Sequence, residues 1–192
     1  MPMHDDIMIR RAQRSDVAAI LAISNHYAVH TAANFAIEPE PLDEWLRTFD
    51  ESSRMLPWLA AGTDDGTVVG FAKASKWKGR CAYSFAAEIS VYIDTAFQGR
   101  RLGRRLYEAL FETLRRQGYR TLLAGITLPN EPSVRLHESM GMRKVAQFDD
   151  IGWKFDQWHT TAYWQTHLDA RNEKPRPIRD VAEVVDDVLR VY

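Results

Sequence analysis

Hydrophobic and polar positions change their spacing along the chain, and each spacing predicts a type of element. Apolar residues three and four apart predict helices at 17–27, 42–49 and 106–114. Alternating or continuously apolar runs predict strands at 7–11, 58–61, 67–74, 83–93, 121–128, 142–148 and 159–167. Ser15 is placed to cap the first helix, and Gly118 to end the third. The pattern therefore predicts a mixed α/β domain that contains a strand–helix–strand unit.

The residues that could carry chemistry lie on the strand at 83–93 and in the turn that follows it. Side chains alternate along an extended chain, so Glu88, Ser90 and Tyr92 share one face of this strand. The turn reads "FQGRRLGRRLY" at 97–107 and joins the strand to the next helix. Glycines there expose backbone N–H groups, and the helix dipole adds positive charge. This arrangement is typical of a phosphate-binding site.

The four arginines of the turn allow a second interpretation, a nucleic-acid patch. The whole chain carries 25 Lys and Arg against 26 Asp and Glu, with a formal net charge of −1. A nucleic-acid-binding domain usually has a strongly basic balance, which this chain lacks. The charge is local, so the sequence favours phosphate binding and predicts no nucleic-acid partner.

Length and composition narrow the class of protein further. A chain of 192 residues suits one domain with a large core. The single cysteine, Cys81, excludes an internal disulfide, and the first residues lack the basic region and apolar core of a signal peptide. The longest apolar run, at 17–23, is far short of the roughly 20 residues that span a bilayer. We expect a soluble cytoplasmic protein with no membrane partner.

The end of the chain differs from the rest. We predict one domain at 1–170, followed at 171–192 by a linker rich in proline and an amphipathic helix. The polar face of this helix is rich in Asp and Glu, which anionic lipids would repel. The helix is therefore expected to pack on the domain or on a dimer mate.

Several motifs together resemble a known family. The turn at 98–103 is similar to the acetyl-CoA loop of the GNAT N-acetyltransferases. In order along the chain, "NFAIEP" (34–39), "EISVYID" (88–94), "GITLPNEPSVRLHESMGM" (125–142) and "GWKFDQWHTTAYWQ" (152–165) resemble the phosphinothricin and methionine-sulfone acetyltransferase branch. The resemblance covers residues 7–168. It implies an α/β (α+β) fold, a twisted, mixed, mostly antiparallel sheet with helices on both faces, splayed where CoA enters.

The resemblance implies acetyl-CoA as co-substrate and a set of residues that bind it. These are Val91, Tyr92 and Ile93 through the main chain, Gln98, Gly99, Arg100, Arg101, Leu102, Gly103 and Arg104 in the turn, and Asn130 and Ser133. Asn130 and Ser133 could instead cap a helix. Arg101 stands where the family usually has glycine, so we expect a negative φ there. Its guanidinium would point outward or help to hold a CoA phosphate.

Two residues are candidates for catalysis. From the pattern alone, Glu88 would be a strand glutamate facing solvent, but the resemblance implies that it is the general base that deprotonates the amine. A backbone N–H at 91–93 would stabilise the oxyanion that forms from the thioester carbonyl. His137 occupies a position where relatives protonate the leaving thiolate. The alternative is that His137 forms hydrogen bonds behind the site.

The acceptor is expected to be the amine of a small amino acid or analogue. Phe35, Trp77, Arg80 and Tyr83 match segments that line the acceptor pocket in this branch, with Arg80 the best candidate for an anionic contact. The three aromatic residues could equally belong to the core. Two rival functions remain open, an acetyltransferase for another amine and a silent acyl-CoA-binding sensor. Relatives are commonly dimers, which implies a homodimer.

A metal site is not expected. His26 and His30 stand four apart on the first helix, but no third ligand at a recognisable spacing accompanies them. Cys81 has no activating base that the sequence can assign, so it is more typical of a small hydrophobic residue than of a nucleophile.

Overall fold

Seven strands form a single twisted sheet within the described part of the chain. The computed structural model describes residues 7–169 and 174–192. The strands are β1 (Met8–Arg11), β2 (Trp58–Gly62), β3 (Val68–Lys76), β4 (Ala86–Ile93), β5 (Thr121–Leu128), β6 (Arg143–Lys154) and β7 (Gln157–His167). Their order across the sheet is β1-β2-β3-β4-β5-β7-β6, with β4 and β5 parallel and the other neighbours antiparallel. The predicted mixed, mostly antiparallel sheet is confirmed.

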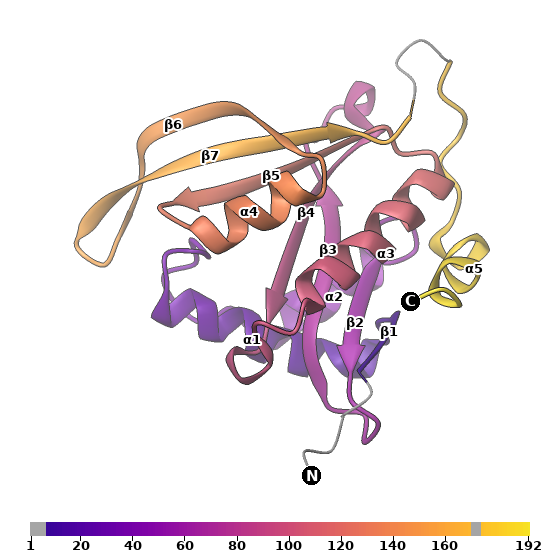
Figure 1. Cartoon of the computed structure of the whole chain (residues 1–192), viewed down its shortest axis with the longest axis horizontal. Helices are drawn as coiled ribbons and strands as arrows, with labels where there is room; N and C mark the ends of the chain where they lie inside the picture. The colour runs from indigo at the N-terminus through magenta and orange to yellow at the C-terminus, as the bar shows by residue number, and fades with distance from the viewer. Residues whose placement is uncertain (1–6, 170–173) are drawn as a thin grey trace.

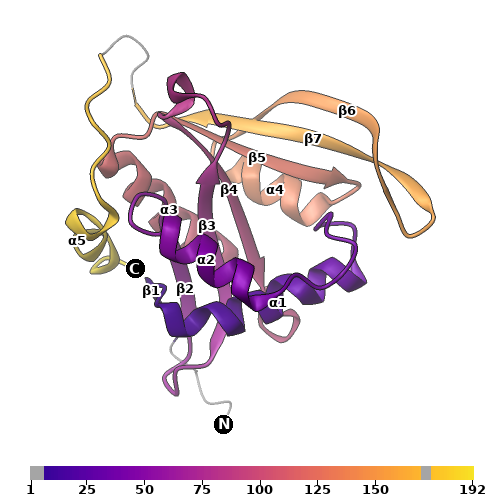
Figure 2. The ribbon, with the colours of Figure 1, turned by 180° about the vertical axis from the view of Figure 1, so that it is seen from behind.

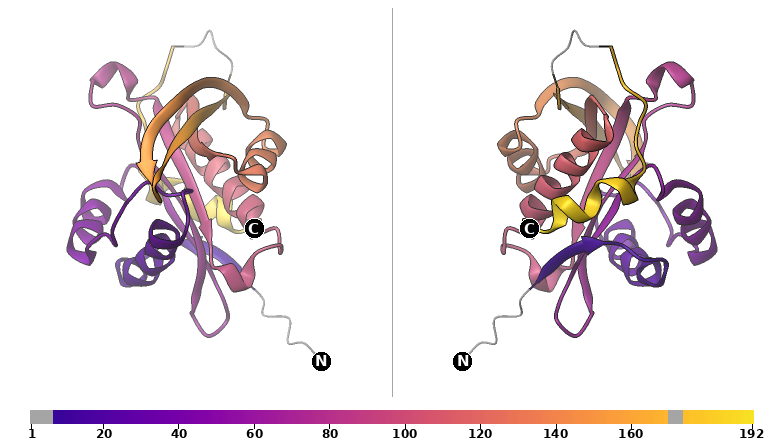
Figure 3. Two further views of the ribbon diagram at one scale, coloured as in Figure 1. Left: turned by 90° about the vertical axis from the view of Figure 1, so that its left-hand side faces the viewer. Right: turned by 90° about the vertical axis from the view of Figure 1, so that its right-hand side faces the viewer.

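Helices cover both faces of the sheet, as predicted (Figures 1, 2 and 3). They are α1 (Val17–His30), α2 (Leu42–Ser52), α3 (Leu102–Gln117), α4 (Glu131–Ser139) and α5 (Val185–Leu189). The edge-on views in Figure 3 show α1 and α2 on one side and α3 and α4 on the other. Each side has its own core, because alternate strand residues point to opposite faces. Phe71, for example, packs with α1 and α2, whereas Ala72 packs with α3.

The sheet opens between β4 and β5, the pair of strands that frames the predicted site. Pairing between them is limited to Ala86–Glu88 and Thr121–Leu123. Beyond Glu88 the two strands diverge (Figure 1). The main chain at 89–93 is therefore paired with β3 on one side and has no ladder with β5 on the other.

The hairpin of β6 and β7 is longer than the predicted strands at 142–148 and 159–167. Phe155 and Asp156 form its two-residue turn, with φ of 52° and 55°. The hairpin extends away from the body of the molecule (Figures 1 and 2). Nearly all of β6 is exposed or half-buried on both faces. With neither face buried, its sequence has no alternation from which its length could be predicted.

Two local predictions were wrong. Ser15 does not cap α1; Asp16 instead accepts the Gln13 N–H at 2.6 Å and binds Arg10 at 2.6 and 2.8 Å. The Arg10 guanidinium lowers the pKa of Asp16, which favours the charged form of this buried carboxylate. The strand predicted from residue 83 begins at Ala86, because 81–83 form a turn of 3-10 helix.

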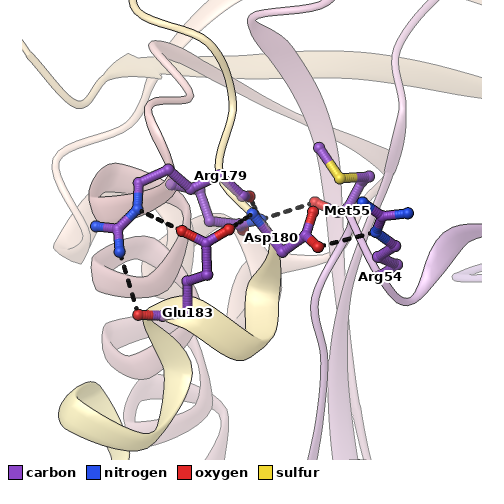
Figure 4. A network of polar contacts seen from close by, with 6 residues as sticks. Arg54, Met55, Arg179, Asp180 and Glu183 are labelled. Carbon is purple, nitrogen blue, oxygen red and sulfur yellow. Dashed lines mark hydrogen bonds and ion pairs between the residues drawn. The ribbon is translucent and has the colours of Figure 1, made fainter.

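The C-terminal segment packs on its own domain. The continuous helix predicted from residue 178 is a 3-10 turn at Val181–Glu183 followed by the short helix α5, but its apolar stripe is buried against α3 and β1. Backbone hydrogen bonds run from Arg179 N–H to Gln117 and from Val181 N–H to Arg54, each 2.9 Å. Figure 4 shows the polar contacts at this junction. The predicted boundary between residues 170 and 171 lies outside the described residues.

No helix in residues 7–169 and 174–192 is long and apolar enough to cross a membrane.

Candidate active site

A cavity of about 1020 Å³ lies where β4 and β5 separate. It is bounded by β4, β5, the start of α3 and the start of α4, and it is at the upper end of the roughly 300–1,000 Å³ typical of cofactor sites. The structure brings nearly all the predicted cofactor residues to its wall: Val91, Tyr92, Ile93, Gln98, Gly99, Arg101, Leu102, Gly103, Arg104, Asn130 and Ser133. Arg100 does not line it, and its guanidinium lies 4.8 Å from the centre of the Phe97 ring.

The turn before α3 supplies the anion-binding part of this cavity. Gly99 has a φ of 76°, and the first backbone bond of α3 runs from Arg105 N–H to the Arg101 carbonyl at 3.1 Å. The N–H groups at the first helical positions, 102–104, have no partner within the helix. Together with the helix dipole they attract a phosphate group. The geometry fits the diphosphate of CoA.

The backbone conformation predicted for Arg101 was wrong. We expected a negative φ, but the structure has a φ of 60° and a ψ of 14°, the left-handed conformation. The turn from Gly99 into α3 requires this geometry at the residue before the helix. A side chain there costs about 1–2 kcal/mol of strain. The usual glycine of the family would avoid this cost, because it lacks a Cβ atom.

Arg101→Gly is therefore expected to raise the free energy of unfolding by about 0.5–1 kcal/mol, since relief of strain exceeds the added entropy of the unfolded chain. Urea denaturation measures this change. Arg100→Gly is the matched control, because φ at Arg100 is not positive and the variant is expected to be slightly destabilised. If both variants lost the same amount of stability, this would contradict backbone strain at Arg101.

Tyr27 was missed by sequence reasoning, although it holds the same turn. Its hydroxyl donates to the Ile93 carbonyl and accepts from Gln98 Nε2, both at 2.7 Å. It thereby joins α1 to the end of β4 and to the predicted CoA loop. The stripe of α1 indicated a buried face at Tyr27, but gave no sign of partners 66 and 71 residues away.

Asn130 and Ser133 cap α4 and also lie at the wall of the cavity. The Asn130 side chain accepts the Ser133 N–H at 3.3 Å and so caps α4. Both residues also line the cavity. Capping uses the Asn130 Oδ1 atom and leaves its amide N–H groups for a ligand.

Glu88 lies at the point where the sheet opens, as the last β4 residue paired with β5. Its side chain is half-buried, and the Tyr163 hydroxyl donates a hydrogen bond to its carboxylate. Burial raises the pKa of Glu88 above its ordinary 4.5, while Tyr163 and the charge of Lys78 oppose that rise. A carboxylate with a raised pKa binds a proton more strongly, which suits a general base.

Tyr163 reaches Glu88 because its partner across the β5–β7 ladder is Gly125. A Cβ atom at Gly125 would lie 3.2 Å from the Tyr163 ring, so a larger residue would displace it. Sequence reasoning missed Tyr163 as a functional residue. The only signal for it was its place in the quoted stretch at 152–165.

His137 is buried on α4 beside the cavity and uses both ring nitrogens. Nδ1 lies 2.7 Å from the Ser133 carbonyl, which can only accept, so Nδ1 carries the proton. Nε2 then accepts from the Tyr107 hydroxyl at 3.0 Å. Burial lowers the pKa of His137. With its one N–H bonded to Ser133, the neutral ring has no proton directed at a thiolate, which favours the role behind the site.

The predicted acceptor residues lie in two separate places. Trp77 packs edge-on against Tyr163, with ring centroids 5.3 Å apart, and so reaches the surroundings of Glu88. Trp77 and Tyr83 line a hollow of about 530 Å³ beside β5 and β7. Arg80 is exposed on the loop between β3 and β4. Phe35 lies on the α1–α2 loop near His159, with ring centroids 6.1 Å apart.

Comparison with known proteins decides the family. A model of the acetyltransferase (GNAT) family matches residues 20–142. The chain belongs to the GNAT acetyltransferase family. It is 36% identical to a phosphinothricin N-acetyltransferase of Streptomyces viridochromogenes over 95% of this chain and 99% of that one. It is 34% identical to an L-methionine sulfoximine/L-methionine sulfone acetyltransferase of Salmonella typhimurium, over 84% and 94% of the two chains.

A solved structure of similar fold contains the co-substrate. It is a phosphinothricin acetyltransferase from Sinorhizobium meliloti in complex with acetyl-CoA, with a TM-score of 0.84, 27% identity and coverage of 88% of this chain and 93% of that one. The resemblance in the sequence is thus confirmed. The protein is an acetyl-CoA-dependent N-acetyltransferase, and acetyl-CoA is its co-substrate.

Proposed function

We propose that this acetyltransferase moves acetyl from acetyl-CoA to the amine of a small amino acid or analogue of the phosphinothricin, methionine sulfone or methionine sulfoximine type. One observation carries the assignment of the base. Glu88 is a half-buried carboxylate with a raised pKa, placed where β4 and β5 separate beside a cavity of cofactor size. The substrates named for the relatives support the acceptor class.

The proposed reaction is a direct transfer. A primary amine is mostly protonated near neutral pH, so Glu88 removes a proton before the nitrogen attacks the thioester carbonyl. A main-chain N–H at 91–93, on the side of β4 that has no ladder with β5, donates to the developing oxyanion. The C–S bond then breaks, the nitrogen loses its second proton as the amide forms, and this proton neutralises the departing CoA thiolate. Tyr163 holds the Glu88 carboxylate in place during these steps.

The proposed CoA site extends from this point to the start of α3. The N–H groups at 102–104 hold the diphosphate, and Arg101 and Arg104 line the same cavity and add positive charge. Asn130 and Ser133 bind the pantetheine arm. His137 and Tyr107 form the buried layer behind it rather than the proton donor.

Release of free thiol tests the function. The protein is mixed with acetyl-CoA and a panel of amines, against a control without protein. An amino-acid enzyme should release thiol with methionine sulfone or phosphinothricin and lose activity when the carboxylate of the acceptor is removed. Activity that survives this removal would assign the enzyme to another amine. Binding of CoA without thiol release for any amine would indicate a silent acyl-CoA-binding module.

We also propose a homodimer located in the cytoplasm. The β6–β7 hairpin exposes a group of large apolar side chains: Phe148, Ile151, Trp153, Phe155 and Trp158. Large apolar side chains gathered on one exposed element are typical of an interface. Sedimentation velocity should show a dimer that Trp153→Asp converts to monomer, while the same change at the exposed Val191 of the tail leaves it intact. A monomeric wild type would contradict the dimer.

A further inference from the structure

The ammonium group of Lys154 joins the tip of the β6–β7 hairpin to the loop between α1 and α2. Lys154 is the last residue of β6 and is only 5% exposed. Its Nζ donates to three main-chain carbonyls, those of Ala28, of Asn34 at 2.6 Å and of Ala36 at 2.7 Å. An ammonium has three N–H donors, so all of them are used.

Because the three acceptors are main-chain carbonyls, Lys154 holds the backbone of this region and not just one side chain. Ala28 is in the last turn of α1, whose final carbonyls have no partner within the helix and attract a cation. Asn34 and Ala36 lie on either side of Phe35. Lys154 thus holds the end of α1 and the loop in one geometry, although more than 115 residues separate it from each acceptor.

The loop forms walls of the site described above. Ala33 lines the cavity between β4 and β5. Asn34 lines an adjoining hollow of about 230 Å³, which shares Ser90 and Tyr92 with that cavity. Ser90 and Tyr92 follow Glu88 on the same face of β4. A displaced loop would therefore change the space on the Glu88 side of the sheet, where the amine must approach.

The hairpin also fixes Phe35 directly. A Cβ atom at Gly152, two residues before Lys154, would overlap the Phe35 ring. The ring therefore rests on the bare backbone of β6. In turn, His159 Nε2 donates to the Lys154 carbonyl at 2.9 Å, which secures the hairpin end.

We propose that Lys154 is a positioning residue for the amine substrate: it holds the loop at 31–36 so that this loop and Phe35 form the acceptor wall, and it takes no part in binding acetyl-CoA. The proposal rests on the proposed function, since it assigns the loop to the amine side of that site. A displacement of about 1 Å in such a wall can lower kcat/KM for the amine about 10²-fold.

The test compares Lys154→Met with Lys144→Met. Methionine keeps most of the volume but donates no hydrogen bond, and Lys144 is an exposed lysine on the same strand. At a temperature where both variants are folded, Lys154→Met should raise the amine KM about 10- to 100-fold. The affinity for acetyl-CoA should change less than about twofold, because the proposed diphosphate site is at the start of α3 and the loop at 31–36 adds only Ala33 to the wall of that cavity. Lys144→Met should match wild type.

Gly152→Ala is an independent variant that leaves the ammonium in place. It should displace the Phe35 ring and raise the amine KM in the same direction. Hydrogen exchange provides a readout without activity: the amides at 31–36 should exchange faster in Lys154→Met and not in Lys144→Met. An amine KM within twofold of wild type in both Lys154→Met and Gly152→Ala, with an active wild-type enzyme, would overturn the inference. A wild type that releases no thiol with any amine would instead contradict the proposed function. In that case hydrogen exchange decides the positioning role: amides at 31–36 that exchange as slowly in Lys154→Met as in wild type would overturn it.

Discussion

Glu88→Gln is expected to lower kcat about 10²- to 10⁴-fold, the contribution typical of a general base. Glutamine keeps the shape of the side chain and can still accept from the Tyr163 hydroxyl, but it cannot take up a proton. The affinity for acetyl-CoA should stay near wild type, because the proposed diphosphate site is at the start of α3. Steady-state kinetics and a calorimetric titration with acetyl-CoA measure the two effects separately.

The dependence of activity on pH is a second test of Glu88 as the base. The base acts only when it is deprotonated, and burial raises the pKa of Glu88 above 4.5. Activity of the wild type should therefore fall as the pH drops through this raised pKa, and the fall should be absent from the residual activity of Glu88→Gln.

Tyr163→Phe tests the partner of the proposed base, Glu88. The Tyr163 hydrogen bond lowers the pKa of Glu88, so its removal should move the acidic limb of the profile to higher pH. An unchanged turnover and an unchanged profile in Glu88→Gln would reject Glu88 as the base, whatever the result for Tyr163.

Removal of residues 178–192 is expected to abolish stable folding. The tail buries Val181, Val184, Val185 and Val188, each no more than 3% exposed, and Val181, Val185 and Val188 belong to the core that contains α3 and β1. Full burial of one such side chain stabilises by about 1.5–3 kcal/mol. Four of them together approach the whole net stability of a domain, about 5–15 kcal/mol. Circular dichroism should show no cooperative thermal transition for the shortened chain at the temperatures where the full chain is folded.

A graded pair of variants checks the mechanism of this loss. Val185→Ala removes buried methyl groups and should lower the free energy of unfolding by about 1–3 kcal/mol. Val191→Ala changes the same residue type at a position that is 77% exposed, and it should leave the stability close to wild type. Equal melting curves for the shortened and full chains would show that the tail is dispensable.

Much of the site could be predicted because its signals are local. Glu88 and its face of β4 follow from the alternation of an extended strand, and the turn at 98–103 follows from glycines between a strand and a helix. The cavity wall contains nearly every cofactor residue that the resemblance implied.

The contacts that adjust this site could not be predicted, because they join distant segments. Tyr163 reaches Glu88 across 75 positions in the sequence only because Gly125 leaves room for its ring. The positive φ of Arg101 was missed because the residue type argues for a negative one. The turn geometry overrides that preference at a cost in strain.

The sequence by itself determined the order of the elements, the two faces of each buried strand and the turn proposed to bind phosphate, because spacing, turn residues and the helix dipole act over a few neighbouring residues. Glu88 became the candidate base only through the resemblance to the family. Only the tertiary structure decided how far β6 extends, where the tail packs, which hydrogen bonds occupy His137 and how Lys154 holds the α1–α2 loop. The physical reason is that these features depend on which surfaces meet after folding, and contacts between residues far apart in the chain leave no periodic trace in it.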